Sequence, residues 1–241
     1  MTISTNDNIP QKGLFGGAFA DALTLIRILL TPLIMFVIIK AWSAKPDDPM
    51  GFVSLDLQLV LLASILFVIA ALTDIADDFI GGDERTSSRF LGKFDDVADS
   101  ILIAGTLLAL LYVSNTAGLL HWTFAVPAFA LLARDIIVSL IKSHQLSKFG
   151  LIETRLGDIK GVLAMLGVCI LVASPWLSNI VDSVRAGNTV ESALNVYDNA
   201  SPLVWNIGLC ILWMAAILSL ITGLKLLTSG KTETIDSHEA I

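Results

Sequence analysis

Seven aspartates lie between residues 74 and 99, where two apolar runs long enough to cross a bilayer are joined, and five of them have helical spacing. Asp74, Asp77 and Asp78 end the first run, and Asp95 and Asp99 precede the second. On helices, side chains three or four residues apart share a face, so each set forms an acidic face beside a short polar turn. A charged side chain within a membrane-spanning segment costs roughly 2.5–3.5 kcal/mol on insertion scales, so these carboxylates indicate a functional site.

Two acidic faces that meet repel each other unless a cation lies between them. Carboxylate oxygens are ligands that Mg²⁺ and Mn²⁺ prefer, and no cluster of His or Cys accompanies the aspartates. We therefore expect Asp74, Asp77, Asp95 and Asp99 to hold Mg²⁺ or Mn²⁺. The alternative is a solvated acidic turn, which the helical spacing on both sides of the turn makes the weaker interpretation.

The same stretch resembles the signature of the CDP-alcohol phosphatidyltransferases, and most closely that of the bacterial phosphatidylglycerophosphate synthases. This signature contains four aspartates, two glycines and an Ala-Arg pair at fixed spacings. The four aspartates are matched in register by Asp74, Asp77, Asp95 and Asp99. The resemblance covers most of the chain, from the first apolar run to the fifth, and implies an enzyme of phospholipid biosynthesis.

The sequence departs from this signature where the family binds its nucleotide. Asp78 stands in place of the first glycine, Gly81 and Gly82 in place of Ala-Arg, and Leu91 in place of the second glycine. By resemblance we expect Asp78, Gly81 and Gly82 at the CDP-binding site. Asp78 either obstructs cytidine or serves as an extra ligand, because a glycine there would let the backbone approach closely.

Arg27 lies inside the first apolar run, in a Thr-Leu-x-Arg pattern that also resembles the first helix of the family. By that resemblance it lies near the active-site cavity and contributes to CDP binding. The alternative is an arginine near a helix end whose guanidinium reaches the lipid headgroups.

The resemblance implies a reaction and its catalytic base. The enzyme would transfer the phosphatidyl group of CDP-diacylglycerol to an alcohol, with glycerol 3-phosphate the favoured acceptor, and release CMP. Asp99 would accept the alcohol proton, since crowding by like charges makes a carboxylate a better base. Metal ions would act as Lewis acid and template.

An anionic acceptor needs a basic pocket. Arg134 and Lys160 resemble positions where the family has an Arg and a Lys lining that pocket, and Arg155 would assist. Asp158 stands where the family usually has a further Lys. The alternative for Arg134 is an intramembrane pair with Asp135 or a position at the headgroups.

Two other functions stay open from the residues. One is a family relative that has lost catalysis and acts as a membrane partner or regulator. The other is a cation transporter, although transporters place their acids near the bilayer midplane on broken helices.

Composition predicts an all-α integral membrane protein. The 241 residues are 55% hydrophobic with a mean hydropathy of +0.78, and only 15% are charged, against about 25% in soluble domains. A net charge of −7 argues against nucleic acid as a partner. Both cysteines, Cys169 and Cys210, fall in apolar runs and are expected to be buried thiols.

Six apolar runs predict a single bundle of about six transmembrane helices with a cytosol-facing polar cavity. Residues 1–17 and 229–241 are expected to be cytosolic tails around a domain of residues 18–228. The expected spans are 20–42, 57–73, 101–113, 119–141, 162–173 and 203–227. Polar connections separate them, among them a turn at SNTAG (residues 114–118) before the fourth span and a long loop over 174–202 with an interfacial piece. Family resemblance implies a homodimer.

Lys and Arg are concentrated in the connections on one side of these spans. The positive-inside rule then places both termini and the aspartates in the cytosol. With the family resemblance, this predicts a multi-pass protein of a bacterial inner membrane, whose lipid substrate stays in the bilayer.

Overall fold

The structure is a computed structural model that describes residues 14–42, 55–81, 95–145, 155–187 and 202–236, with side chains described over 21–42, 55–73, 97–137, 159–187 and 202–223. All regular structure in these ranges is helical, which confirms the predicted all-α fold. The helices are α1 (Leu14–Ala41), α2 (Leu57–Gly81), α3 (Asp95–Thr116), α4 (Trp122–Gln145), α5 (Arg155–Arg185) and α7 (Leu203–Asp236).

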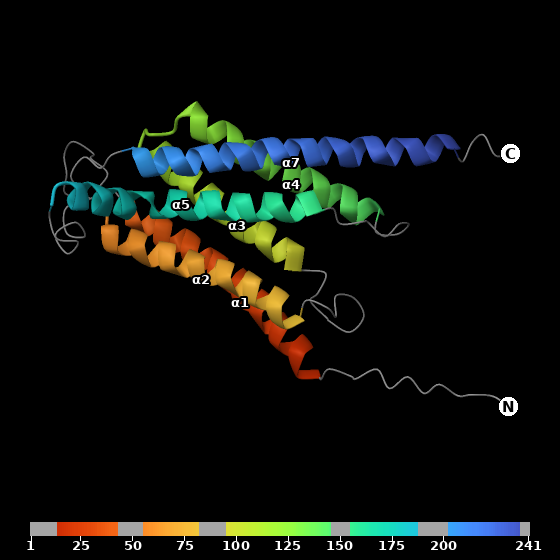
Figure 1. The fold of residues 1–241 in the computed structure, drawn as a ribbon, viewed down its shortest axis with the longest axis horizontal. Coiled ribbons are helices and arrows are strands. Elements are labelled where there is room, and N and C mark those ends of the chain that lie inside the picture. Colours follow the sequence, from red (N-terminus) through yellow and green to blue (C-terminus); the bar gives the residue numbers. More distant parts are fainter. Residues whose placement is uncertain (1–13, 43–54, 82–94, 146–154, 188–201, 237–241) are drawn as a thin grey trace.

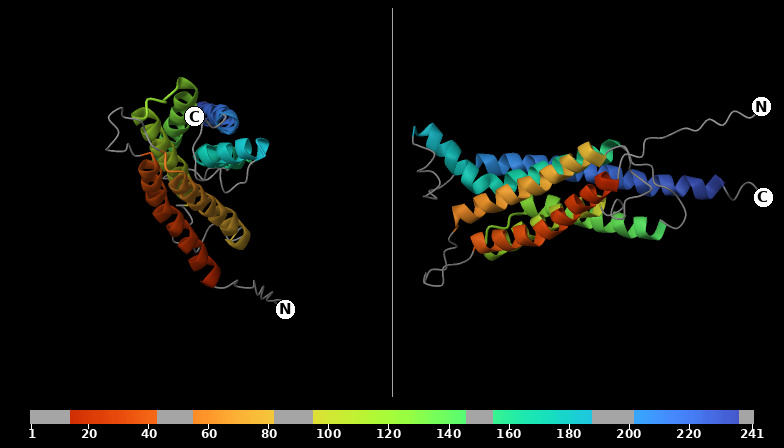
Figure 2. Two further views of the ribbon diagram at one scale, coloured as in Figure 1. Left: turned by 90° about the vertical axis from the view of Figure 1, so that its left-hand side faces the viewer. Right: turned by 90° about the horizontal axis from the view of Figure 1, so that it is seen from below.

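The helices run up and down along one long axis (Figures 1 and 2). Helices α1, α3 and α5 begin, and α2, α4 and α7 end, at the same end of the bundle. We call this the aspartate end, because α2 finishes there just after Asp78 and α3 starts there at Asp95. The connections between consecutive helices therefore alternate between the aspartate end and the opposite end.

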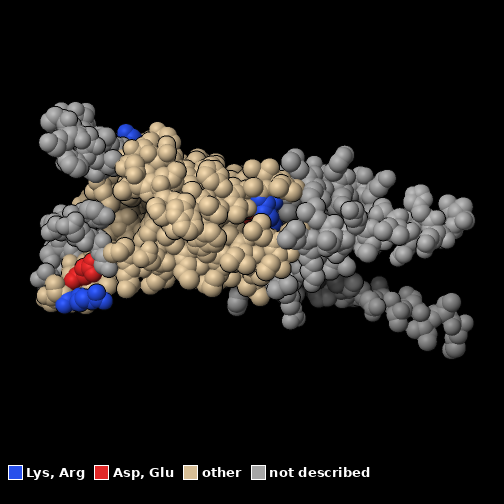
Figure 3. Space-filling view, turned by 90° about the horizontal axis from the view of Figure 1, so that it is seen from above, with Lys and Arg blue, Asp and Glu red and all other residues tan. Residues whose placement is uncertain are grey.

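Four helices are long and apolar enough to span a membrane within the described residues, namely Asp21–Ala41, Val97–Thr116, Ile159–Arg185 and Leu203–Gly223. The apolar part of α2, Leu57–Thr73, is shorter. On the face drawn in Figure 3, the described surface along the middle of the bundle is uncharged, and charged side chains lie toward its two ends. Such a band is what contact with lipid tails requires.

The core lies where α1 packs on α2 and α3, and where α5 packs on α2 and α7. Ile34, Phe67, Leu107 and Leu212 are fully buried there. Large apolar side chains such as Leu29, 63% exposed, cover the outside. Without water to drive helix association, close packing must hold such helices together.

Gly105 lets α1 and α3 approach closely. A Cβ at this position would lie 2.7 Å from Cγ2 of Thr31 and 3.1 Å from the sulfur of Met35. Small residues commonly allow such contact between membrane helices. This close approach brings α1 beside α3 where both carry charged side chains.

The turn after α3 follows the pattern expected of the SNTAG segment. Gly118 has a φ of 67°, and the backbone N–H groups of Gly118 and Leu119 donate to the carbonyls of Asn115 and Ser114. These two bonds form a Schellman motif, which a glycine in the left-handed conformation completes. The predicted turn is confirmed.

The predicted loop over 174–202 is wrong in its first part, because α5 continues through Pro175 to Arg185. Proline removes one backbone donor, and a helix in a membrane tolerates it when neighbours satisfy the remaining groups. Here Ser174 donates to the carbonyl of Leu171 at 2.8 Å, and Trp176 Nε1 donates to Ser64 of α2 at 3.0 Å. Figure 2 shows α5 changing direction in its last third.

The outer helices also extend past the expected domain limits. Helix α1 begins at Leu14, inside the expected tail of residues 1–17, and α7 continues to Asp236, inside the expected tail of residues 229–241. Both extensions contain glycine, Gly16 and Gly17 in α1 and Gly230 in α7, which lowers helix propensity but ends neither helix.

Candidate active site

Arg27 and Asp99 form an ion pair between α1 and α3. Nη1 of Arg27 donates to Oδ1 of Asp99, and the two residues are 72 positions apart in the chain. The Arg27 side chain is fully buried, whereas that of Asp99 is 29% exposed. A buried guanidinium needs a counter-ion. The alternative in which Arg27 reaches the headgroups is therefore wrong.

A hydrogen bond within α1 lies next to the ion pair. Thr31, one turn along α1, donates to the carbonyl of Arg27 at 3.0 Å. Thr31 is also the residue that contacts the position of Gly105 on α3. The same close helix contact thus places the guanidinium beside the carboxylate.

The other candidate aspartates are placed by their backbone alone. Asp74, Asp77 and Asp78 lie in the last turns of α2, and Asp95 begins α3, so the predicted helical spacing is confirmed. Both helix ends lie at the aspartate end (Figures 1 and 2). The side chains of these four residues are outside the described part, and so is Gly82, while Gly81 is the last residue of α2.

The residues present fit a divalent cation by their chemistry. Four carboxylates on two helix ends offer only oxygen ligands, which suit Mg²⁺ and Mn²⁺. Asp99 keeps part of its carboxylate exposed beside Arg27. The metal site and the CDP-binding roles of Asp78, Gly81, Gly82 and Arg27 stay predictions.

A second charged cluster joins α4 to α5. Oδ1 of Asp135 accepts hydrogen bonds from Nη1 of Arg134 at 2.9 Å and from Nζ of Lys160 at 3.0 Å. The three side chains are between 10 and 16% exposed. The structure therefore brings together Arg134 and Lys160, the two cations expected to line an acceptor pocket.

The stem of Arg134 lies against α7. A Cβ at Gly223 would be 3.6 Å from Cγ of Arg134. Nε of Arg134 is buried and has no hydrogen-bond partner among the described residues. Arg155 is the first residue of α5, and its side chain is outside the described part.

Sequence reasoning missed two relationships in these clusters. It gave Arg27 no protein partner, although a lone arginine in an apolar run requires one when buried. It paired Asp135 with Arg134 only as an alternative to function, and it did not foresee that Lys160 shares the same carboxylate. The adjacent Arg-Asp in an apolar helix was the available signal.

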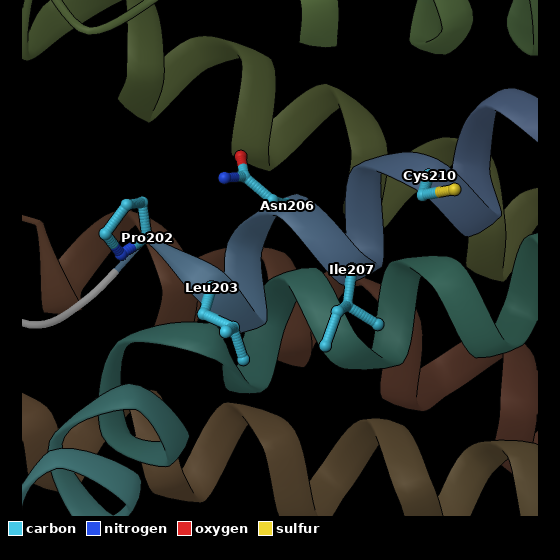
Figure 4. Close-up of a pocket in the computed structure, with 5 residues that line it drawn as sticks. All are labelled: Pro202, Leu203, Asn206, Ile207 and Cys210. Atoms are coloured by element: carbon cyan, nitrogen blue, oxygen red, sulfur yellow. The ribbon is translucent and has the colours of Figure 1, made fainter.

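A shallow pocket lies away from both clusters, at the start of α7 (Figure 4). It is lined by Pro202, Leu203, Asn206, Ile207 and Cys210. In Figure 1 this part of α7 is at the opposite end of the bundle. The predicted polar cavity facing the cytosol stays a prediction.

Comparison with known proteins gives one consistent result. A family model described as CDP-alcohol phosphatidyltransferase matches residues 18–221. Proteins named CDP-diacylglycerol–glycerol-3-phosphate 3-phosphatidyltransferase are similar to most of the chain. The one from Rickettsia typhi is 27% identical over 87% of this chain and 95% of its own length. The one from Shigella flexneri serotype 5b is 25% identical over 89% of this chain and 95% of its own length. The one from Cereibacter sphaeroides is 26% identical over 67% of this chain and 77% of its own length.

Proposed function

This chain belongs to the CDP-alcohol phosphatidyltransferase family, and from that premise we propose that it transfers the phosphatidyl group of CDP-diacylglycerol to glycerol 3-phosphate and releases CMP. Membership makes it a transferase of phospholipid biosynthesis. The observation that carries the choice of acceptor is that the relatives above bear this activity in their names over two thirds or more of this chain.

The arrangement of the helices supports this reaction. The apolar band of the bundle suits the lipid tails of the donor (Figure 3). The ends of α2 and α3 that contain the aspartates lie at one end of the bundle (Figure 1), where the pyrophosphate of the donor would reach the membrane edge. Asp74, Asp77, Asp95 and Asp99 would hold Mg²⁺ or Mn²⁺. When bound, such ions neutralise the pyrophosphate and polarise the phosphorus.

The chemical step needs a base and a leaving group. The hydroxyl oxygen of the acceptor attacks the phosphorus that bears diacylglycerol, the bond from this phosphorus to the CMP oxygen breaks, and the hydroxyl proton passes to Asp99. Arg27 holds one oxygen of Asp99 through their ion pair, while the Asp99 side chain stays partly exposed. Orientation of this kind is a large part of what an enzyme contributes.

Arg134 and Lys160 would bind the phosphate of the acceptor. They converge on one carboxylate oxygen at the α4–α5 contact, so one anion could contact both cations. Arg155, at the start of the same helix as Lys160, would add a third positive charge.

The proposal also includes the location of the protein in the cell and its oligomeric state. The excess of Lys and Arg in the connections at the aspartate end supports a cytosolic site and cytosolic termini in a bacterial inner membrane. A homodimer is proposed by family resemblance.

The second candidate is a relative that has lost catalysis, which Asp78 at the position of the first signature glycine favours. Purified protein in liposomes would be given CDP-diacylglycerol, Mg²⁺ or Mn²⁺ and a panel of alcohols, and CMP release measured. The proposal expects release with glycerol 3-phosphate and little with inositol or serine. No release with any alcohol, from protein that remains folded, would favour the partner or regulator.

A further inference from the structure

Asp135 is the common partner of two cations that come from different helices. Its Oδ1 accepts from Arg134 Nη1 at 2.9 Å and from Lys160 Nζ at 3.0 Å. The two cationic nitrogens are therefore no farther apart than the sum of these distances. Two like charges this close in a site with little water would separate without a negative charge between them.

We propose that Asp135 is a positioning residue that holds Arg134 and Lys160 together as one binding site for the phosphate of the acceptor. This inference rests on the proposed function. Asp135 need not touch the substrate, because its effect passes through the two cations.

The charge balance of the cluster supports the proposal. One carboxylate shared by two cations leaves a net positive charge, so the cluster still attracts an anion. The phosphate monoester of the acceptor carries close to two negative charges at neutral pH and has several acceptor oxygens, which match the planar fork of Arg134 and the ammonium of Lys160.

The packing of Arg134 also supports the proposed phosphate site. Its stem lies beside Gly223 of α7, and its Nε is buried with no hydrogen-bond partner among the described residues. A buried donor without a partner is costly, and an anion at the cluster would satisfy it. Arg134 thus has donor capacity beyond its bond to Asp135.

The opposite role for Asp135 is competition with the phosphate for the same two cations. The two roles differ in the sign of one measurement. If Asp135 positions the cations, its neutral isostere raises the KM for glycerol 3-phosphate. If it competes, the same change lowers that KM.

The test is steady-state kinetics on the full chain in liposomes, with Asp135→Asn, Asp135→Glu and a control, Asp182→Asn. Asp182 lies on the same helix as Lys160, at the opposite end of α5, so Asp182→Asn controls for the loss of one carboxylate. We expect Asp135→Asn to raise the KM for glycerol 3-phosphate at least tenfold while the KM for CDP-diacylglycerol changes less than twofold. Asp135→Glu keeps the charge and should stay within about threefold of the wild type.

A comparison in a second background keeps the proposal testable if Asp135→Asn alone fails to fold. The variant Asp135→Asn with Lys160→Gln removes one charge of each sign, and Lys160→Gln is its reference. We expect the added Asp135→Asn to raise the KM for glycerol 3-phosphate less than threefold in this background, because one of the cations to be positioned is already gone.

The proposal is overturned if Asp135→Asn leaves the KM for glycerol 3-phosphate unchanged or lowers it, if it raises both KM values equally, or if the change is as large in the Lys160→Gln background. Failure of the proposed function is a separate result, because the wild type itself would then release no CMP with glycerol 3-phosphate.

Discussion

Arg27 of α1 and Asp99 of α3 form an ion pair in which the arginine is fully buried and the carboxylate is partly exposed. The pair joins two helices that are also held close by Gly105. It therefore fixes the proposed catalytic base relative to the first helix, and it compensates one of several carboxylates that would otherwise repel each other at the aspartate end.

Replacement of Arg27 by methionine should leave Asp99 without the hydrogen bond that orients it and without the positive charge that offsets its own. We expect CMP release to fall at least about a hundredfold, and the unfolding free energy in detergent to fall by up to about 3 kcal/mol, because Asp99 can still reach water. Arg27→Lys should have CMP release and stability between those of the wild type and Arg27→Met, since lysine keeps the charge without the planar guanidinium. Arg185→Met, at the exposed end of α5, is the control. Unchanged CMP release in Arg27→Met would contradict this account of the pair.

Gly105→Ala tests whether close contact between α1 and α3 maintains the pair. The added methyl group would lie 2.7 Å from Cγ2 of Thr31, so either this side chain or the helices must shift, and we expect a loss of about 1–3 kcal/mol in unfolding free energy. Gly161→Ala is the matched control, because no atom lies within 4 Å of its added Cβ. It should be neutral or up to about 1 kcal/mol stabilising. Equal effects of the two substitutions in denaturant titrations would argue against the packing role of Gly105.

Trp176→Phe tests the extension of α5 past Pro175. The substitution removes the hydrogen bond to Ser64 of α2 and leaves most of the ring, so we expect a loss of about 1 kcal/mol. Trp122→Phe is the control, since Trp122 is 64% exposed at the start of α4. Equal stability of Trp176→Phe and wild type, measured by the same titration, would show that the contact contributes nothing.

Local patterns were enough to predict most of the fold. Apolar runs of sufficient length indicated the helices, and Gly118 within SNTAG indicated the turn after α3. The helix through Pro175 could not be predicted, because proline and serine are loop signals in isolation. Ser174 itself satisfies the carbonyl of Leu171, which Pro175 leaves without a backbone donor, and Trp176 adds a hydrogen bond to Ser64, 112 residues earlier in the chain. Neither bond can be read from loop signals alone.

The candidate site could be predicted in its residue types but not in its partners. Helical spacing grouped the aspartates, and resemblance indicated Arg134 and Lys160. Which carboxylate each cation meets depends on how helices pack across long separations, as between Arg27 and Asp99 or Lys160 and Asp135. Periodicity within one helix contains no information on such pairs.

Cysteine labelling tests the proposed orientation. Asp236→Cys marks the end of α7 at the aspartate end, and Ala186→Cys follows α5 at the opposite end. In a background with Cys169→Ala and Cys210→Ala, a membrane-impermeant thiol reagent applied to spheroplasts should label Ala186→Cys at once. It should label Asp236→Cys only after lysis, because the positive-inside rule places that end in the cytosol. The reverse pattern would mean that the aspartates face outward.

In the proposed reaction, the aspartate end of this bundle catalyses phosphatidyl transfer to glycerol 3-phosphate. The most direct measurement is the incorporation of radiolabelled glycerol 3-phosphate into lipid by purified protein with CDP-diacylglycerol and Mg²⁺ or Mn²⁺, compared among wild type, Asp99→Asn and Asp182→Asn. We expect labelled lipid and an equal amount of CMP from wild type and Asp182→Asn, and a loss of at least about a hundredfold in Asp99→Asn. Equal incorporation by Asp99→Asn and wild type would contradict this proposal.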